Sequence, residues 1–306
     1  MLLVGVMAVV PPVSRDALTH HLAVPKLYLQ HGGMVEIPAI EFSYYPMNLD
    51  LLYLLPLFFG NDILPKFIHF AFALATAGLI FGYLRRRTTV NLALAGALFF
   101  LSLPVIVKLS VTVYVDLGLI FFTTWSLLSL LRWRATGFQA RELAIAAVAC
   151  GLALGTKYNA LPAFLLLAFL VPVLFVRNQP QNALASKKAV LWGACFASIA
   201  LAVFSPWMIR NLIWTGNPLY PLYDGLFNPG GSGHGSSLGP WAIRKLVYGE
   251  TWWETLLIPL RVFFQGQDDL PQLFDGRLNP LLLILPIFAF FPRINRGKIG
   301  QAQGQG

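Results

Sequence analysis

The amino-acid sequence predicts an all-α protein, a polytopic transmembrane helical bundle of about eight spans. The chain is 57% hydrophobic and only 11% charged, with a mean hydropathy of +0.67. Soluble domains carry about 25% charged residues, so lipid is the expected main solvent of this chain. The net charge of +9 does not indicate nucleic-acid binding, because the basic residues stand in short clusters between apolar runs. Such clusters are typical of topology determinants in membrane proteins.

Eight apolar runs are the expected spans. The first, 1–13, is shorter than the roughly 20 residues needed to cross a bilayer. It lacks a basic region and a small-residue cleavage site, which favours a clipped transmembrane helix over a signal peptide. The run 49–59 is also too short to span, and predicts either an interfacial helix or a lead-in to the next span. The remaining seven expected spans are 63–84, 89–107, 111–131, 143–157, 159–176, 189–207 and 280–292.

The basic residues predict the orientation of these spans. Alternate connections hold twelve of the 22 basic residues but only one of the 13 acidic ones, Glu142. Those connections should face the cytoplasm, so that the first loop, 14–62, and a long loop, 208–279, face outward. We expect one transmembrane domain over 1–292 and a polar cytoplasmic tail over 293–306. A glycine-rich stretch at 228–240 is typical of a flexible linker. The cytoplasmic basic residues are Arg85, Arg86, Arg87, Arg132, Arg134, Arg141, Arg177, Lys187, Lys188, Arg293, Arg296 and Lys298.

Two acidic residues stand at or inside the predicted membrane boundary, where a carboxylate is costly. Asp116 lies within the run 111–131, near its outward end. It either bonds to a neighbouring helix or faces a water-filled cavity open to the outside. Asp16 directly follows the first run, and either caps a helix or serves as a base at the outer boundary. His20, four residues later, would share its helix face.

Three cations are expected at the same outward level. Lys157 stands in the short connection between two spans, as a snorkelling turn residue or as part of an anion site. Arg210 follows the run that ends at 207, and Lys108 is the third outward cation. Together, the two acids and these cations, which lie on different helices, could form a site that binds an anionic lipid and a nucleophile. His21 and Lys26 are further candidates for contact with the substrate.

Several motifs resemble those of the GT-C membrane glycosyltransferases. The nearest group is the bacterial one related to the Rgt lipopolysaccharide glycosyltransferases, the protein O-mannosyltransferases and the aminoarabinose transferases. The resemblance covers roughly residues 5–220. The motifs are the runs at 16–26, 45–46 and 57–60 in the first outer loop, Tyr114-Val115-Asp116-Leu117, Gly155-Thr156-Lys157-Tyr158, and 205–211 followed by Gly216-Asn217-Pro218.

The resemblance implies a GT-C-like fold and an inverting hexosyl- or pentosyltransferase with a polyprenyl-phosphate-linked donor. The acceptor would be a lipid, a polysaccharide such as lipopolysaccharide, or a protein. Its place would be the bacterial inner membrane, as part of cell-envelope synthesis, with the active face on the periplasmic side. Asp16 matches the first-loop acid that acts as general base, and Asp116 the second acidic site. Lys157 and Arg210 would bind the donor phosphate, and Tyr114 would contact substrate.

A metal site is a weaker implication of the same resemblance. Several relatives have a second acid directly after the first-loop aspartate, whereas this chain has Ala17. Asp16 and Asp116 together could still hold a divalent cation, Mg or Mn. No other cofactor is expected.

Two other function classes fit the same span pattern. An O-antigen polymerase or ligase would also carry a long outward loop such as 208–279. A multi-span transporter would instead place charges near the bilayer midplane, on broken helices related by repeats. Here the acids gather toward one face and no repeat is visible, which favours the glycosyltransferase.

Overall fold

The computed structural model describes residues 2–179, 183–229, 240–268 and 270–290, and these residues contain helices and irregular segments but no strand. The chain divides into two compact units, 1–237 and 238–306. Each unit is described by itself. The all-helical fold class predicted from the sequence is confirmed for the described residues.

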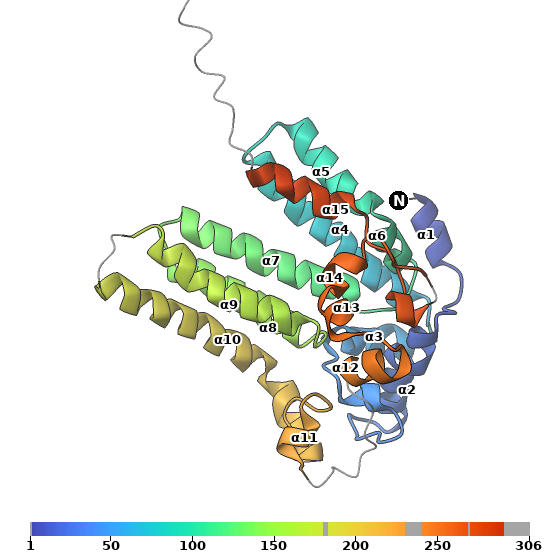
Figure 1. Cartoon of the computed structure of the whole chain (residues 1–306). Coiled ribbons are helices and arrows are strands. Elements are labelled where there is room, and N and C mark those ends of the chain that lie inside the picture. Colours follow the sequence, from blue (N-terminus) through green and yellow to red (C-terminus); the bar gives the residue numbers. More distant parts are fainter. Residues whose placement is uncertain (1, 180–182, 230–239, 269, 291–306) are drawn as a thin grey trace, which may run out of the picture. The chain divides into compact units, whose positions relative to one another are not determined.

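The first unit holds thirteen helical elements among its described residues (Figure 1). Two of them are not α-helices: η1 is a π-helix and η2 is a 3-10 helix. In chain order the elements are α1 (Leu2–Ala8), η1 (Ala17–His21), α2 (Ala23–Gln30), η2 (Glu41–Tyr44), α3 (Asn48–Phe58), α4 (Leu64–Arg85), α5 (Val90–Ser102), α6 (Pro104–Ser110), α7 (Asp116–Ala135), α8 (Ala140–Leu154), α9 (Ala160–Val176), α10 (Ala183–Thr215) and α11 (Asp224–Phe227).

Fewer helices than expected are long and apolar enough to cross a membrane. Among the described residues α4 and α10 meet that condition, and α5 with α6 would make a third span if the pair, bent by 65°, is one broken span. The break stands at Pro104, inside the expected span 89–107, because proline cannot continue the hydrogen-bond ladder of a helix. Helices α8 and α9 have only 15 and 17 residues. The structure therefore does not confirm eight spans.

Two predicted boundaries move in the structure, and one predicted helix is confirmed. The span expected at 111–131 begins only at Asp116, which is thus the first residue of α7. Helix α10 does not end at residue 207 but continues to Thr215 with Pro206 inside it, so the following loop begins later than predicted. The helix expected at 49–59 is present as α3.

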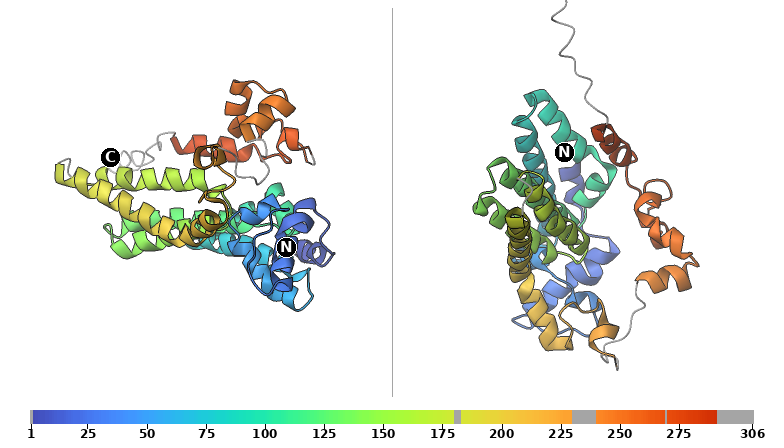
Figure 2. Two further views of the ribbon diagram at one scale, coloured as in Figure 1. Left: turned by 90° about the horizontal axis from the view of Figure 1, so that it is seen from below. Right: turned by 60° about the vertical axis from the view of Figure 1, so that its left-hand side comes forward.

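Helices α7 to α10 run side by side in both views (Figures 1 and 2), and α4 packs against α5 and α7. Their interface buries a cluster of aromatic and aliphatic side chains that includes Trp133, Phe196 and Phe204. Gly151 permits the contact between α8 and α10, because a Cβ there would lie 2.5 Å from the Ala200 carbonyl oxygen. Small residues at such crossings let helix backbones approach closely, as in membrane bundles.

Three of the basic connections predicted to share one membrane side, those after α4, α7 and α9, lie at one end of the bundle, whereas the fourth, at 293–298, lies outside the described residues. Arg134, in the last turn of α7, donates to Asn178 after α9 at 3.2 Å. Arg132 lies 3.7 Å from Glu142 in the first turn of α8. The opposite ends of these helices carry Asp116 and Lys157.

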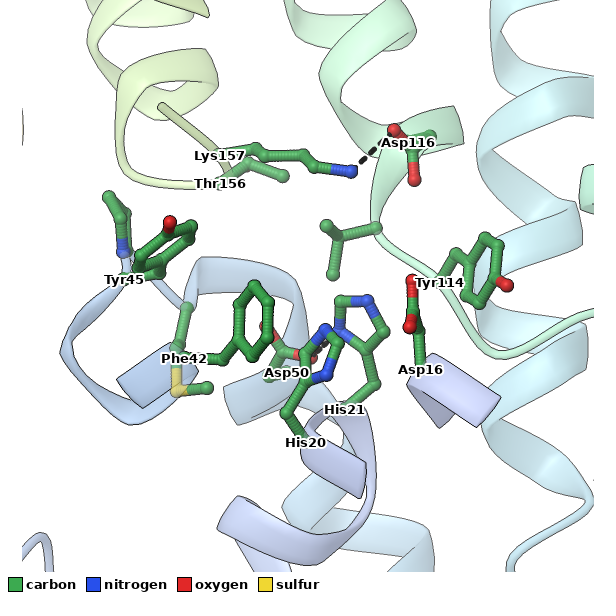
Figure 3. Close-up of a pocket in the computed structure, with 13 residues that line it drawn as sticks. Asp16, His20, His21, Phe42, Tyr45, Asp50, Tyr114, Asp116, Thr156 and Lys157 are labelled. Carbon is green, nitrogen blue, oxygen red and sulfur yellow. Dashed lines mark hydrogen bonds and ion pairs between the residues drawn. The ribbon is translucent and has the colours of Figure 1, made fainter. Parts of the chain in front are cut away.

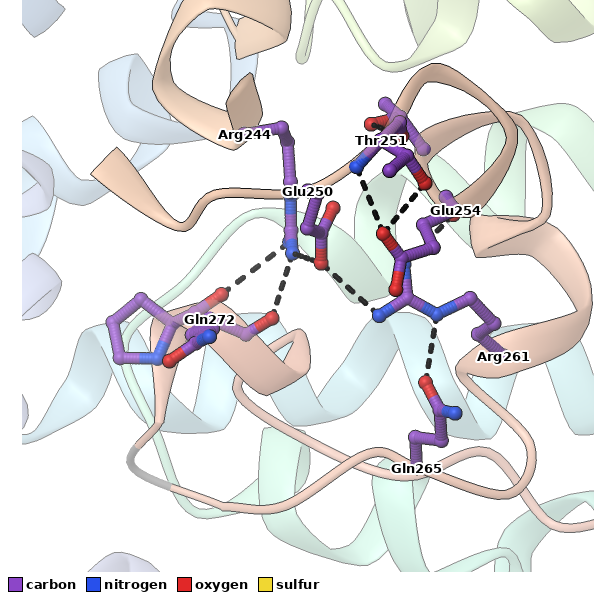
Figure 4. A network of polar contacts seen from close by, with 9 residues as sticks. Arg244, Glu250, Thr251, Glu254, Arg261, Gln265 and Gln272 are labelled. Atoms are coloured by element: carbon purple, nitrogen blue, oxygen red, sulfur yellow. Dashed lines mark hydrogen bonds and ion pairs between the residues drawn. The ribbon is translucent and has the colours of Figure 1, made fainter. Parts of the chain in front are cut away.

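The second unit consists of short helices joined by irregular chain. A buried carboxylate, Glu250, organises it by accepting from Arg244 at 3.1 Å and Arg261 at 3.0 Å (Figure 4). The expected span 280–292 contains only the short elements α15 and η5 in its described part, whereas the predicted tail 293–306 and most of the glycine-rich stretch lie outside the described residues. The elements of this unit are α12 (Pro240–Ala242), η3 (Ile243–Val247), α13 (Trp252–Leu256), α14 (Ile258–Arg261), η4 (Pro271–Leu273), α15 (Leu281–Ile284) and η5 (Leu285–Phe290).

Candidate active site

A cavity of about 110 Å³ lies where four separate segments of the first unit meet (Figure 3). The segments are the first loop around η1, the stretch from Phe42 to the start of α3, the start of α7, and the end of α8. Five of the residues singled out from the sequence line this cavity: Asp16, His21, Tyr114, Asp116 and Lys157. Residues more than 140 positions apart in the chain are thus brought together.

An ion pair forms one wall of the cavity. Lys157 Nζ donates to Asp116 Oδ1 at 2.8 Å, and both side chains keep about a quarter to a third of their surface exposed, 26% for Asp116 and 30% for Lys157. Asp116 stands in the first turn of α7, where the helix dipole favours a negative charge. The Lys157 ammonium has three donors, so it can hold Asp116 and still bind a second anion in the cavity.

His69, which the sequence reading did not single out, fixes the start of α7. Its Nδ1 lies 3.1 Å from the carbonyl oxygens of both Leu109 and Thr112, and its Nε2 accepts from the Leu117 backbone N–H at 2.9 Å. A ring that donates at Nδ1 and accepts at Nε2 is neutral. The buried imidazole therefore holds Asp116 in place through its neighbour.

A buried histidine–aspartate pair forms the floor of the cavity. His21 Nδ1 lies 2.7 Å from Asp50 Oδ1, and both side chains are almost fully buried. The sequence reading missed Asp50, although an acidic residue inside the apolar run 49–59 was a usable signal. With Nδ1 donating to this carboxylate, Nε2 of a neutral His21 is left as an acceptor.

Asp16 is the cavity carboxylate for which the described residues provide no fixed partner. It precedes η1 but makes no side-chain capping bond, so the interpretation of Asp16 as a helix cap is wrong. Its carboxylate points to the cavity beside Tyr114 (Figure 3), and Tyr114 in turn lies against His21 with ring centroids 5.6 Å apart. Within the described residues Asp16 forms no ion pair, which leaves its carboxylate available to a ligand.

Arg210 and Lys26 do not line the cavity. Arg210 is buried between the rings of Trp207 and Trp214, with its guanidinium carbon 4.6 and 4.8 Å from their centroids. It donates to the Tyr44 carbonyl oxygen at 2.6 Å and to Asn211 Oδ1 at 2.8 Å. Lys26 is exposed on α2. Arg210 therefore supports the chain around Tyr45, whose side chain does line the cavity.

Residues 51–210 match the model of the dolichyl-phosphate-mannose–protein mannosyltransferase family. The chain belongs to this family. It is a family of GT-C-type membrane glycosyltransferases that use polyprenyl-phosphate-linked sugars, which confirms the resemblance inferred from the motifs. Asp116, Lys157 and Arg210 fall inside the matched region, whereas Asp16 and His21 precede it. The search of curated proteins and the search of solved structures returned no match.

In this family member, Arg210→Lys is expected to lower the free energy of unfolding by about 2 kcal/mol. A lysine cannot reproduce the forked hydrogen bonds or the stacking of the guanidinium, and unmatched buried acceptors cost free energy. Thermal unfolding in detergent measures the effect, with Arg177→Lys at an exposed site as the control. A variant of normal stability that has lost sugar transfer would return Arg210 to the predicted role in phosphate binding.

The buried His20 ring is expected to make stability depend on pH. Its burial, reinforced by the nearby His21 and Lys157, lowers its pKa to about 3, against 6.5 for the free side chain. Between these values the unfolded chain binds a proton that the folded chain does not, so stability should fall as the pH drops below about 6.5. The expected slope is up to about 1.4 kcal/mol per pH unit.

The unfolding midpoint of His20→Gln, compared with the unmodified protein from pH 7.5 to pH 4.5, tests this expectation. As the pH falls, the midpoint of the unmodified protein should drop more steeply than that of His20→Gln. The difference between the two midpoints should therefore shift toward the variant. His31→Gln, at an exposed histidine, is the control and should follow the unmodified protein. Parallel curves for all three proteins would contradict a buried neutral His20.

Proposed function

We propose that this family member moves a sugar from a polyprenyl-phosphate-linked donor to a hydroxyl group on a lipid, polysaccharide or protein acceptor. The observation that carries the proposal is the cavity in which Asp16 lies with the Asp116–Lys157 pair. It offers a base on one wall and a cation on the other, the two groups that substitution at a sugar phosphate requires.

The proposed reaction is a single displacement at the anomeric carbon. The acceptor oxygen forms a bond to that carbon while Asp16 takes the hydroxyl proton. The bond from the anomeric carbon to the phosphate oxygen breaks, and its electron pair leaves with the polyprenyl phosphate. Lys157 stabilises the charge that grows on this leaving group, and Asp116 holds Lys157 at 2.8 Å. One displacement inverts the configuration at the anomeric carbon.

His21 and Tyr114 are proposed to orient the sugar. Asp50 fixes the ring of His21, so its second nitrogen can accept from a sugar hydroxyl at a defined position. Tyr114 lies beside Asp16 (Figure 3), with its ring centroid 5.6 Å from that of His21. Tyr45 and Phe42, whose rings are 5.2 Å apart, line the cavity beside Lys157 and offer faces on which a sugar ring can stack. Lys26 is exposed on the same first loop and remains a predicted substrate contact.

The proposed reaction does not use a divalent cation. Among the described residues no three His, Cys, Asp or Glu side chains are grouped as metal ligands. The carboxylate of Asp116 is already engaged with Lys157, and a cation bridging Asp16 and Asp116 would have to displace that ammonium. These residues therefore fit a carboxylate paired with a lysine better than a metal site.

We place the cavity on the outer face of the membrane, in bacteria the periplasmic face of the inner membrane. The argument is the charge distribution, because the arginine-rich connections lie at the end of the bundle opposite to Asp116. A donor that diffuses within the bilayer can reach such a site without a soluble nucleotide sugar.

The deciding experiment supplies membranes containing the chain with a radiolabelled polyprenyl-phosphate sugar, and then separates lipid, lipopolysaccharide and protein. Label in one of these fractions supports the proposal and names the acceptor class. Transfer only from preassembled, diphosphate-linked oligosaccharides would indicate a polymerase or ligase. Uptake of a soluble substrate into vesicles without any transfer would indicate a transporter.

A further inference from the structure

A second and larger cavity lies between α4 and α7, with a volume of about 620 Å³. Its walls come from the last two turns of α4, the last two turns of α7 and the start of α8. The candidate active site is at the other end of α7: Arg132, which lines this cavity, follows Asp116 by sixteen residues. At 1.5 Å per residue this is about 24 Å along the helix, close to the thickness of a bilayer's hydrocarbon core. The two cavities therefore belong to opposite membrane faces.

Arginine gives this cavity its charge. Arg86 and Arg87 are exposed at its rim, and Arg132 is partly exposed, with Glu142 at 3.7 Å as the single acidic lining residue. The lining is thus positive by two charges. Arg87 lies over the Tyr83 ring at 3.8 Å, whereas the Arg86 side chain makes no hydrogen bond or ion pair with the described residues. Its planar guanidinium can bind a phosphate through two parallel hydrogen bonds.

The part of the same cavity farther from the arginines, along α4, is apolar and open. Gly78 and Gly82, one turn apart on α4, face it together, and a Cβ at either position would meet no atom within 4 Å. Glycines at a helix crossing normally let a second helix approach closely, as Gly151 does on α8. Here the space they leave is not filled by another described helix of this unit. Leu79 and Leu128 complete an apolar wall below the arginines.

We propose that this cavity binds an anionic diacyl phospholipid, with the phosphate on Arg86 and Arg132 and one acyl chain along Gly78 and Gly82. A phosphate-binding group above an apolar slot, at the level where a helix leaves the hydrocarbon, matches the structure of a phospholipid. A soluble anion would need no apolar slot. Basic pockets between transmembrane helices bind anionic headgroups in this way. Positive connections that only fix topology need no cavity, and so do not account for the glycine-lined slot.

Native mass spectrometry of the purified full chain in neutral detergent tests this proposal. Phosphatidylglycerol and phosphatidylcholine with identical acyl chains are added at equal concentrations. We expect phosphatidylglycerol to be retained at least about 10-fold better. Arg86→Gln/Arg132→Gln should abolish this preference, whereas Lys187→Gln/Lys188→Gln, which removes the same charge from the start of α10, should keep it. Equal retention of both lipids, or equal loss in both variants, would overturn the proposal.

Two further experiments refine the test. One separates the contribution of charge from that of the slot's shape, and the other distinguishes a lipid ligand from a free anion. Gly82→Leu keeps every arginine but fills the slot, and it should reduce lipid retention as strongly as the arginine variant. Arg86→Gln alone changes an exposed residue, so it keeps the test valid if the double variant does not fold. Inorganic phosphate at millimolar concentration should not displace the lipid. Displacement by phosphate, or normal lipid retention in Gly82→Leu, would indicate a simple anion site and would contradict the assignment to a lipid.

Discussion

Asp16→Asn is expected to reduce the rate of sugar transfer by about 100-fold or more, while the protein still folds and reaches the membrane. A positioned general base contributes about 10²- to 10⁴-fold to a reaction of this kind, and an amide cannot accept the acceptor's proton. Asp16 is exposed and makes no capping bond, so its loss should change stability by no more than about 0.5 kcal/mol. Initial rates with a labelled polyprenyl-phosphate sugar measure the effect.

The matched control for this prediction is Asp62→Asn. Asp62 belongs to the same predicted outer segment but does not line the cavity, so transfer by this variant should be normal. Retained turnover in Asp16→Asn would remove Asp16 from the role of base. In that case the His21–Asp50 pair, buried beside it, becomes the next candidate.

Lys157→Met is expected to reduce transfer by about 10²- to 10³-fold, the effect of removing one preorganised group that stabilises charge in a transition state. Lys157→Arg, which keeps the charge but changes its geometry, should retain part of the activity. The ion pair with Asp116 is partly exposed, so its loss should cost less than about 1 kcal/mol of stability. Rates and unfolding midpoints measured together separate these two effects.

A double-mutant cycle with Asp116→Asn shows whether Lys157 acts on the substrate or only through its partner. If Lys157 binds the leaving phosphate, its loss should cost much more activity than the loss of Asp116, whose proposed task is to hold Lys157. Equal losses in the two single variants and in the double variant would instead indicate one structural unit. Such a result would contradict the proposed role in phosphate binding.

Three of the four charged residues that line the candidate site could be predicted from the sequence, because a charge at or within an apolar run breaks the expected pattern. Asp16, Asp116 and Lys157 are charged groups at or within apolar runs, where charge needs a reason. Asp50 carries the same signal, inside the run 49–59 that predicts an interfacial helix. His69 left no comparable signal, because its contacts are with backbone atoms of residues about 40 positions further along the chain.

The helix boundaries were predicted less well, for a physical reason. Hydropathy measures how apolar a run is, and it does not show where the backbone bends. The run 89–107 is predominantly apolar, yet it falls in two helices bent by 65°. Helix α10 continues past the expected end through Pro206. Arg210 was placed at the outer surface by its position after an apolar run. In the structure it is buried between two tryptophans.

The sequence by itself determined the helical class, the family and the identity of the charged residues of the site, because composition and local motifs carry that information. Only the tertiary structure decided that Asp16, His21, Asp116 and Lys157 share one cavity, and that Arg210 does not line it. Convergence depends on how helices far apart in the chain cross. Those crossings are set by how closely the helices pack, as where Gly151 lies against the backbone of α10. No single stretch of sequence encodes such a contact.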